Sequence, residues 1–435
     1  MSNELTGIFG ALVLFAAILL RVPVAVALGL TGFLGYAAIE GWPRALYVLG
    51  STPFDMAHGY FLSVVPLFVL MGAVAFRSGL SRDLFVAANA MFSGRRGALA
   101  MATIGACAGF GAICGSSLAT AATMTRVAVP EMRALGYDNR LSTGSVASAG
   151  TLAILIPPSV IMVIYAIIAE QSVAKLFAAG LVPGLMLTLF HLVVVWGLVR
   201  IHPEWAPTAP ALPWSRRLRD LTRMWQMVLL FLLSIGGIYV GWFSPTEAAA
   251  VGAFGALVLS FIFGERFGWR AFAESLHEAA TTTAMLFFIV IAAVLFSYFL
   301  VQTRIPQALV DWVKAMGFAP LTVIIALTVF YVILGCFVDS LGMVLITVPV
   351  FFPLVTSLGY DPIWFGILLV VVVEIGLITP PVGMNLFVIQ AQQPDVPLWH
   401  LYQGILPFLL ADTALIVFLL VWPELALWLP RLLYR

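Results

Sequence analysis

The chain has 435 residues, of which 62% are hydrophobic and only 9% are charged, and its formal net charge is +1. A soluble domain carries about 25% charged residues, so this composition excludes a soluble globular protein and indicates an integral membrane protein. The small net charge gives no reason to expect a nucleic-acid partner. The apolar runs do not alternate as the strands of a membrane barrel do, so spanning helices are expected instead.

Ten apolar runs predict full membrane spans, in chain order 8–20, 22–39, 61–77, 144–169, 177–200, 225–242, 246–263, 278–300, 362–392 and 402–422. Two further runs, 98–132 and 321–355, are too long for one span, and polar residues interrupt each near its middle. We interpret both as re-entrant hairpins, because non-helical backbone at that depth requires protein or a wet cavity beside it. The predicted fold class is therefore an all-α integral membrane protein.

A repeated pattern relates the two halves of the chain at one offset of 223 residues. LGYD at 135–138 recurs at 358–361, and Pro-Pro at 157–158 recurs at 380–381. This predicts a first repeat over 1–200, a linker over 201–224 and a second repeat over 225–435. Each repeat has five spans and one hairpin. Because five is odd, the copies are inverted. Paired interruptions at matching places in two halves are typical of a secondary transporter.

The distribution of basic residues predicts the orientation in the membrane. Of the 21 Lys and Arg residues, the predicted topology places fourteen on one side, six on the other and Arg126 within the first hairpin. The positive-inside rule puts the fourteen in the cytoplasm and both termini on the opposite side. The linker contains Arg216, Arg217 and Arg219. It is interpreted as a connector, with an interfacial helix on anionic headgroups or on a partner subunit as the alternative.

Oxygen-rich residues gather at the first hairpin tip and at the break in the span that follows. Two consecutive prolines, Pro157 and Pro158, remove two backbone donors, so carbonyls near 153–156 lose their helical partners. These carbonyls and the hydroxyls of Ser116 and Ser117 are hard oxygen ligands that suit an alkali cation. The half-helix after the break presents its positive end to an anion. A simple proline kink with a satisfied backbone is the alternative.

The second repeat adds two acids in apolar surroundings, Asp339 at its hairpin tip and Glu374 in its broken span. Such acids are functional candidates by default. Asp339 is a candidate cation ligand or proton acceptor, with helix capping as the alternative. Glu374 is a candidate functional acid, and the alternative is that it makes a structural hydrogen bond. Arg126 is a candidate partner for a substrate carboxylate, unless its side chain extends to the surface.

Three segments resemble the large membrane subunit, the DctM type, of tripartite ATP-independent periplasmic (TRAP) transporters. They are GSSLATAATMTR from Gly115, SPTEAAAVGAFGAL at 244–257 and LGYDPIWFGILLVVVVEIGLITPPVGMNLFVI at 358–389. The resemblance covers nearly the whole chain. It implies an ion-transporter-superfamily fold of the elevator type. It also implies sodium-coupled import of an organic anion, a carboxylate or a sugar acid, across the bacterial inner membrane.

The resemblance also implies two protein partners and a set of sites. The partners are a small four-helix membrane subunit (Q type), expected as a separate chain, and a periplasmic solute-binding protein (P type). Two or more sodium ions and no other metal are expected. The first sodium site would comprise Ser116, Ser117, Gly150, Thr151, Ile156 and Pro157. The second would comprise Gly335, Asp339, Thr379, Pro380, Gly383 and Asn385. Substrate contacts are expected at Gly115, Ser340, Ser159 and Arg126, although the position of Arg126 matches no fixed role in the family.

Other functions remain as alternatives to this interpretation. A single-component sodium/dicarboxylate carrier of related architecture would share the same sequence features and differ in needing no binding protein. An intramembrane enzyme is not expected, because the chain has no Gly-x-Ser-x-Gly, His-Glu-x-x-His or paired Gly-Asp motif. A passive channel rarely needs two inverted hairpins. The sequence does not identify the organic anion.

Overall fold

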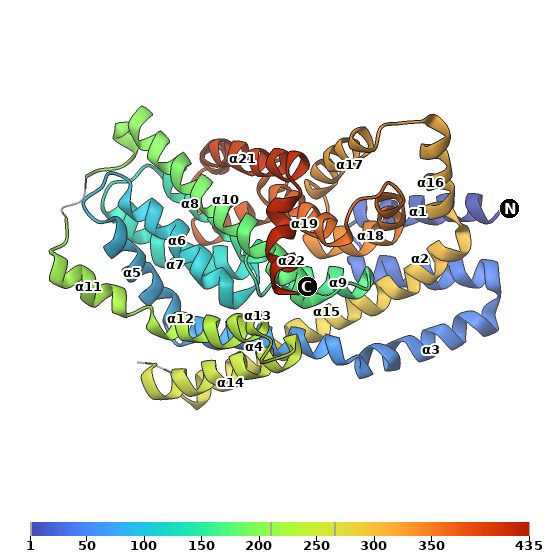
Figure 1. Cartoon of the computed structure of the whole chain (residues 1–435), viewed down its shortest axis with the longest axis horizontal. Coiled ribbons are helices and arrows are strands. Elements are labelled where there is room, and N and C mark those ends of the chain that lie inside the picture. The colour runs from blue at the N-terminus through green and yellow to red at the C-terminus, as the bar shows by residue number, and fades with distance from the viewer. Residues whose placement is uncertain (1, 209–210, 265–266, 435) are drawn as a thin grey trace.

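A computed structural model describes residues 2–208, 211–264 and 267–434 of the chain (Figure 1). Arg266 and Arg435, which contribute to the predicted charge distribution, lie outside the described residues, as does Pro210 of the linker. In the described part the regular structure is helical, and the one extended contact is an isolated bridge between Arg96 and Thr208. This confirms the predicted all-α class.

The helices of the first half of the chain are α1 (Asn3–Leu19), α2 (Val24–Glu40), α3 (Trp42–His58), α4 (Val64–Arg77), α5 (Leu80–Phe92), α6 (Ala98–Cys114), α7 (Ser117–Ala134), α8 (Asn139–Leu155), α9 (Val160–Ile168) and α10 (Val173–Ile201). Those of the second half are α11 (Trp214–Thr222), α12 (Trp225–Phe231), α13 (Gly237–Val240), α14 (Pro245–Phe263), α15 (Trp269–Thr303), α16 (Ile305–Met316), α17 (Pro320–Gly335), α18 (Ser340–Ser357), α19 (Pro362–Ile378), α20 (Met384–Gln392), α21 (Leu398–Val421) and α22 (Glu424–Leu433). Short 3₁₀ turns occupy Tyr60–Ser63 and Pro203–Trp205, and a π-helical turn, Leu232–Gly236, joins α12 to α13.

Among the described residues, five helices are long and apolar enough to cross a membrane, or up to eight if each bent pair of helices counts as one span. This is fewer than the ten predicted spans. The remaining three predicted spans correspond to α1, α2 and α19, which are apolar but shorter, with 17 residues each. One of the five is α18, which the sequence assigns to a hairpin arm. All ten predicted spans nevertheless coincide with helices.

The helix ends fall where the sequence predicts interruptions. α6 and α7 meet at Gly115 and Ser116, whereas α17 and α18 meet over residues 336–339. Residues 156–159, which include the first Pro-Pro pair, separate α8 from α9, and the chain bends by 41° there. Residues 379–383, with the second pair, separate α19 from α20. Both Pro-Pro peptide bonds are cis.

Small residues allow the long helices to approach one another closely, as is usual for packing in lipid. α2 lies along α15, and a methyl group added at Gly32 would stand 2.5 Å from the backbone nitrogen of Phe296. On α8, a methyl group added at Gly144 would stand 2.4 Å from the carbonyl oxygen of Gly404 on α21. Such contacts fix α8 among its neighbours and so position the first break.

In the described part of the chain, five helices lie outside the predicted spans and hairpins: α3, α5, α11, α16 and α22. α11 falls within the predicted linker, where it exposes Trp214 (74%) and Leu218 (61%) beside several arginines. The structure therefore has a helix where the alternative interpretation of the linker expects one. α3, α16 and α22 place charged and apolar residues on opposite faces, and that mixture lowers their hydropathy below that of a spanning run.

Candidate functional site

The tip of the first hairpin lies directly against the first Pro-Pro break. Gly115 ends α6 in the left-handed conformation (φ +64°), and a methyl group added there would stand 2.6 Å from the carbonyl oxygen of Pro158. Behind the tip, a methyl group added at Gly150 on α8 would stand 3.0 Å from Cβ of Ala121 on α7. The structure thus brings the tip and the broken helix of the first predicted sodium site together.

The second hairpin packs against its own broken helix through two glycines. A methyl group added at Gly335 would stand 2.9 Å from Cα of Gly376, two residues before the C-terminal residue of α19. Gly383 has a φ of +60° and begins α20. The break is also held from outside, because the Tyr402 hydroxyl donates to the carbonyl oxygen of Pro381 (2.9 Å).

Several predicted ligands make local helix contacts in the structure. The Ser116 hydroxyl accepts a hydrogen bond from the amide of Ala119, and Asp339 Oδ2 accepts from the amides of Leu341 and Gly342 (both 3.1 Å). Both residues therefore cap helices. The Thr151 hydroxyl donates to the carbonyl of Ser148, and that of Thr379 to the carbonyl of Ile375. Capping was the alternative role for Asp339, and it leaves oxygen lone pairs free for a second role.

Asn385, assigned from the sequence to the second sodium site, also reaches the first repeat. Its side-chain nitrogen donates to the carbonyl oxygen of Ala147 on α8 (3.3 Å), and its residue is fully buried. Its Oδ1 atom has no hydrogen-bond partner among the described residues. The Thr120 hydroxyl on α7 is likewise buried, beside the weakly polar Cys114 thiol. Buried oxygens without strong donors suit a cation.

A cavity of about 430 Å³ lies between the two hairpin tips, α4 and α15. Predicted site residues that line it are Gly115, Ser116, Ser117, Arg126 and Ser340. The N-terminal ends of α7 and α18 both face it, since residues 116–119 and 340–341 are in its wall. The N-terminus of α7 is capped by the neutral Ser116 hydroxyl and keeps its partial positive charge, so this end of the cavity suits an anion. The N-terminus of α18 is instead capped by the Asp339 carboxylate.

Arg126 is the cation of this cavity that no carboxylate neutralises among the described residues. Its Nε atom donates to the neutral amide oxygen of Gln392 (3.3 Å), and its guanidinium lies 5.9 Å from the centre of the Phe76 ring. A neutral partner leaves the charge of the guanidinium available to a ligand.

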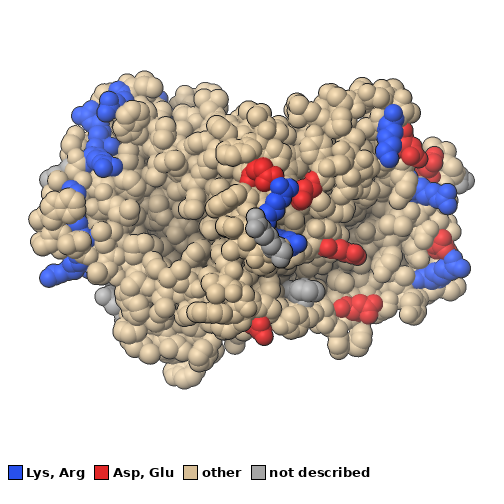
Figure 2. Space-filling view, viewed as in Figure 1, with Lys and Arg blue, Asp and Glu red and all other residues tan. Residues whose placement is uncertain are grey.

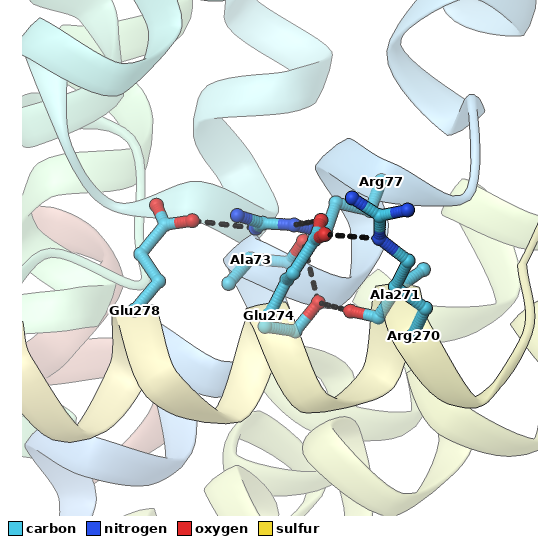
Figure 3. A network of polar contacts seen from close by, with 7 residues as sticks. Ala73, Arg77, Arg270, Ala271, Glu274 and Glu278 are labelled. Atoms are coloured by element: carbon cyan, nitrogen blue, oxygen red, sulfur yellow. Dashed lines mark hydrogen bonds and ion pairs between the residues drawn. The ribbon is translucent and has the colours of Figure 1, made fainter.

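Sequence reasoning missed the α4 and α15 wall of the cavity, including Arg77, Glu278 and Thr282. Figure 3 shows Arg77 of α4 bridging to two acids of α15: it bonds Glu278 and lies 3.7 Å from Glu274. Arg270 bonds Glu274 from the other side (3.1 Å). The charge of Arg77 is thus balanced within the protein, unlike that of Arg126.

The first hairpin is also tied to the chain after α20. Arg133 on α7 donates to the side-chain oxygen of Gln393 (2.9 Å) and pairs with Asp395. The hydrogen bond from Arg133 holds the pKa of the Asp395 carboxyl below its usual range. Together with Arg126–Gln392 and Asn385–Ala147, these contacts connect α7 and α8 of the first repeat with α20 of the second.

Most of the predicted sodium-site residues lie outside the cavity wall, and so do Ser159 and Glu374. Ser159 caps α9, accepts from the amide of Met162 and is 1% exposed. Glu374 on α19 is fully buried, and neither carboxylate oxygen has a partner among the described residues, so the structural hydrogen bond of the alternative interpretation is absent there. Nearby on α10 and α21, His191 Nε2 and Asp412 Oδ1 are hydrogen-bonded at 2.9 Å with both side chains fully buried.

Apolar helices, two broken helices beside hairpin tips and a cavity between those tips define a helical membrane-transporter fold. The backbone resembles that of the YdaH transporter of Alcanivorax borkumensis with a TM-score of 0.62 over 88% of this chain and 89% of that chain. The two sequences are 17% identical, so this likeness concerns the fold alone.

Residues 11–425 match the family described as "Tripartite ATP-independent periplasmic transporter, DctM component", and the chain belongs to that family. Among its relatives, the C4-dicarboxylate TRAP transporter large permease protein DctM of Pseudomonas aeruginosa is 38% identical over 93% of this chain and 94% of its own length. The protein of the same name in Vibrio cholerae is 32% identical over 95% and 94%. The resemblance inferred from the sequence is therefore confirmed, and the family is one of multi-pass transporter permeases.

Proposed function

We propose that this permease imports an organic anion across the inner membrane, driven by an inward sodium gradient. The observation that carries the proposal is the cavity between the hairpin tips, where Arg126 and the N-termini of α7 and α18 converge. A cation without a carboxylate partner among the described residues, and the N-terminus of α7, which Ser116 caps, favour a carboxylate or another oxyanion over a neutral solute.

Sodium is proposed as a co-transported substrate, bound beside each hairpin tip. At the first site the ligands would come from Ser116, Ser117, Thr151 and backbone near Gly150, Ile156 and Pro157. At the second they would come from Asp339, Thr379 and backbone near Gly335, Pro380 and Gly383. Asn385 stands between the α20 break and α8, and its unpartnered Oδ1 supports a cation in this region. Hydroxyl, amide and carbonyl oxygens are the hard ligands that alkali cations prefer.

Transport would proceed by an elevator motion of one helical body past another. α7, α8 and α20 are joined by the Arg126, Arg133 and Asn385 contacts and would move together. α2, α4, α14 and α15 pack on one another and would form the scaffold. The cavity wall extends from the hairpin tips to Arg77, which the predicted topology places at the cytoplasmic side with both termini periplasmic. The conformation would then be inward-facing.

The family implies a small permease subunit and a periplasmic binding protein, and we propose that both serve this chain. One relative, 31% identical, is a DctMQ permease for isethionate and is longer, since the chain covers 60% of it. Other relatives are named for C4-dicarboxylates, sialic acid and ectoine. The solute carried would be an organic acid that the binding protein selects, and Arg126 would contact its anionic group.

Arg126→Gln should test the proposed substrate contact. It keeps a polar side chain, removes the unbalanced charge and should lower the rate of anion uptake at least about tenfold, which corresponds to about 1.4 kcal/mol. Uptake would be measured in proteoliposomes with both partner proteins. Arg82→Gln is the matched control, because Arg82 is exposed on α5, outside the cavity wall and outside the contacts that join α7, α8 and α20. Equal uptake by wild type and Arg126→Gln would contradict the proposed contact.

A further inference from the structure

A second hollow of about 770 Å³ opens on the outer surface where α5, α6 and the end of α10 meet. Three arginines form its rim: Arg95 and Arg96 from the α5–α6 connection and Arg200 from the last turn of α10. Its wall is apolar and includes Phe92, Leu192 and Trp196. We name this hollow the arginine groove. It shares no lining residue with the cavity between the hairpin tips.

The rim carries positive charge that the described residues do not balance. None of the ion pairs in the described part of the chain includes Arg95, Arg96 or Arg200. Arg96 makes a long contact with the Thr208 hydroxyl (3.5 Å), and the Arg200 guanidinium lies 4.6 Å from the Trp196 ring centre. The nearby carboxylate of Glu204 bonds His202 instead (3.0 Å).

The neighbouring helix α11 indicates that the arginine groove lies at the depth of the lipid headgroups. Arg217 of α11 donates to the carbonyl oxygen of Ser93, two residues before Arg95 (3.0 Å). α11 exposes Trp214 and Leu218 together with basic side chains, the composition of a helix lying in the membrane interface. Figure 2 shows basic side chains gathered at the end of the molecule where Figure 1 shows α11.

We propose that the arginine groove binds an anionic phospholipid. The three guanidiniums would hold the headgroup phosphate, and an acyl chain would lie along the apolar wall. That wall continues into the lipid-facing surface of α10, where Val193 and Trp196 are 54% and 52% exposed. A free phosphate or a soluble anion would use the rim and leave the wall empty, whereas a phospholipid matches both parts.

The purified full-length protein, stripped of lipid, would be titrated with phosphatidylglycerol, cardiolipin or phosphatidylcholine, and bound lipid counted by native mass spectrometry. Each arginine near a membrane surface is worth about 1 kcal/mol, or about fivefold in affinity. The triple variant Arg95→Gln/Arg96→Gln/Arg200→Gln should therefore bind phosphatidylglycerol about 100-fold more weakly, and each single variant about fivefold. Cardiolipin, with two phosphates, should bind more tightly than phosphatidylglycerol.

The control variant Arg82→Gln/Arg219→Gln/Arg270→Gln removes the same charge from exposed positions outside the arginine groove and should keep tight binding. The proposal is overturned if both triple variants lose binding equally, since charge alone would then suffice. It is also overturned if phosphatidylcholine binds as tightly as phosphatidylglycerol, or if inorganic phosphate displaces the lipid at equal concentration. The single variants decide the matter should the triple variant fail to fold.

Discussion

At the scale of single residues, Asp339 has one role that the structure shows, as a helix cap, and a second that we propose, as a sodium ligand. Oδ2 accepts two backbone amides at the start of α18, which explains why an acid stands at this tip without requiring a ligand. Its second oxygen and the half-buried position leave room for the proposed cation. Asparagine at this position would still cap α18 but carries no charge, so the substitution separates the helix cap from the proposed sodium ligand.

Asp339→Asn should leave the thermal stability of the purified protein unchanged and raise the sodium concentration for half-maximal uptake. Asp339→Ala should in addition lose about 1 kcal/mol of stability, because the cap is removed. Thermal unfolding and a sodium titration of uptake measure the two effects. If Asp339→Asn has the sodium titration of the wild type, the carboxylate is a cap and does not bind sodium.

The buried His191–Asp412 hydrogen bond should contribute to stability. Asp412→Ala leaves His191 Nε2 without its partner in a site from which water is excluded, and should cost about 1–3 kcal/mol. Asp412→Asn retains an oxygen acceptor at that position and should cost less. The midpoints of thermal unfolding in one detergent compare the variants. Equal losses for alanine and asparagine would show that the hydrogen bond is not what stabilises this contact.

Individual site residues were predictable where residue type and backbone break coincide in the sequence. Gly115, Ser116 and Ser340 reach the cavity wall because each stands at a hairpin tip. Arg77 and Glu278 were missed, because they reach the cavity by tertiary packing of α4 on α15, which leaves no local signal. Ser159 follows the break but caps α9 out of reach.

At the scale of helices, the Gly335–Gly376 contact explains how the second hairpin sits on its broken helix. A methyl group added at Gly376 would stand 2.7 Å from Cα of Gly335, and backbone atoms cannot move aside as a flexible side chain can. The backbones of α17 and α19 are thus in direct contact close to the second proposed sodium site. The first hairpin repeats the arrangement, with Gly111 against Ala153.

Gly376→Ala should push α17 away from α19, cost about 1–3 kcal/mol of stability through overpacking and lower sodium-driven uptake. Gly50→Ala is the control, since Gly50 lies inside α3 with nothing within 4 Å of an added methyl group. That change should gain up to about 1 kcal/mol from helix propensity. Thermal unfolding and uptake would be measured for both. Equal stability and uptake for the two variants would rule out the close contact.

Most helices were predictable because long apolar runs and their interruptions are properties of the local sequence. The breaks beside Gly115, Asp339 and the two Pro-Pro pairs all fall where expected. α3, α16 and α22 were not predicted, since their charged faces hide the apolar ones from a search for uniformly apolar runs. Their positions depend on neighbours that the sequence does not identify.

At the scale of the whole molecule, the proposed transport requires that sodium binding and anion binding be coupled. The hairpin tips and breaks would bind sodium, the cavity between them would bind the organic anion, and the body containing α7, α8 and α20 would carry both across the membrane. Contacts between the repeats, such as Asn385 with Ala147, join parts that are far apart in the sequence. We therefore expect the coupling of sodium binding to anion binding to depend on the whole body of α7, α8 and α20. An uptake measurement tests this coupling directly.

Uptake of the cognate organic anion into proteoliposomes holding the permease, its small subunit and the binding protein tests the central claim most directly. The substrate would be identified first by thermal-shift screening of the binding protein. An inward sodium gradient should drive uptake above the external concentration. Removing sodium while imposing a proton gradient of equal size should abolish accumulation. Equal accumulation under the proton gradient in sodium-free buffer would contradict the account.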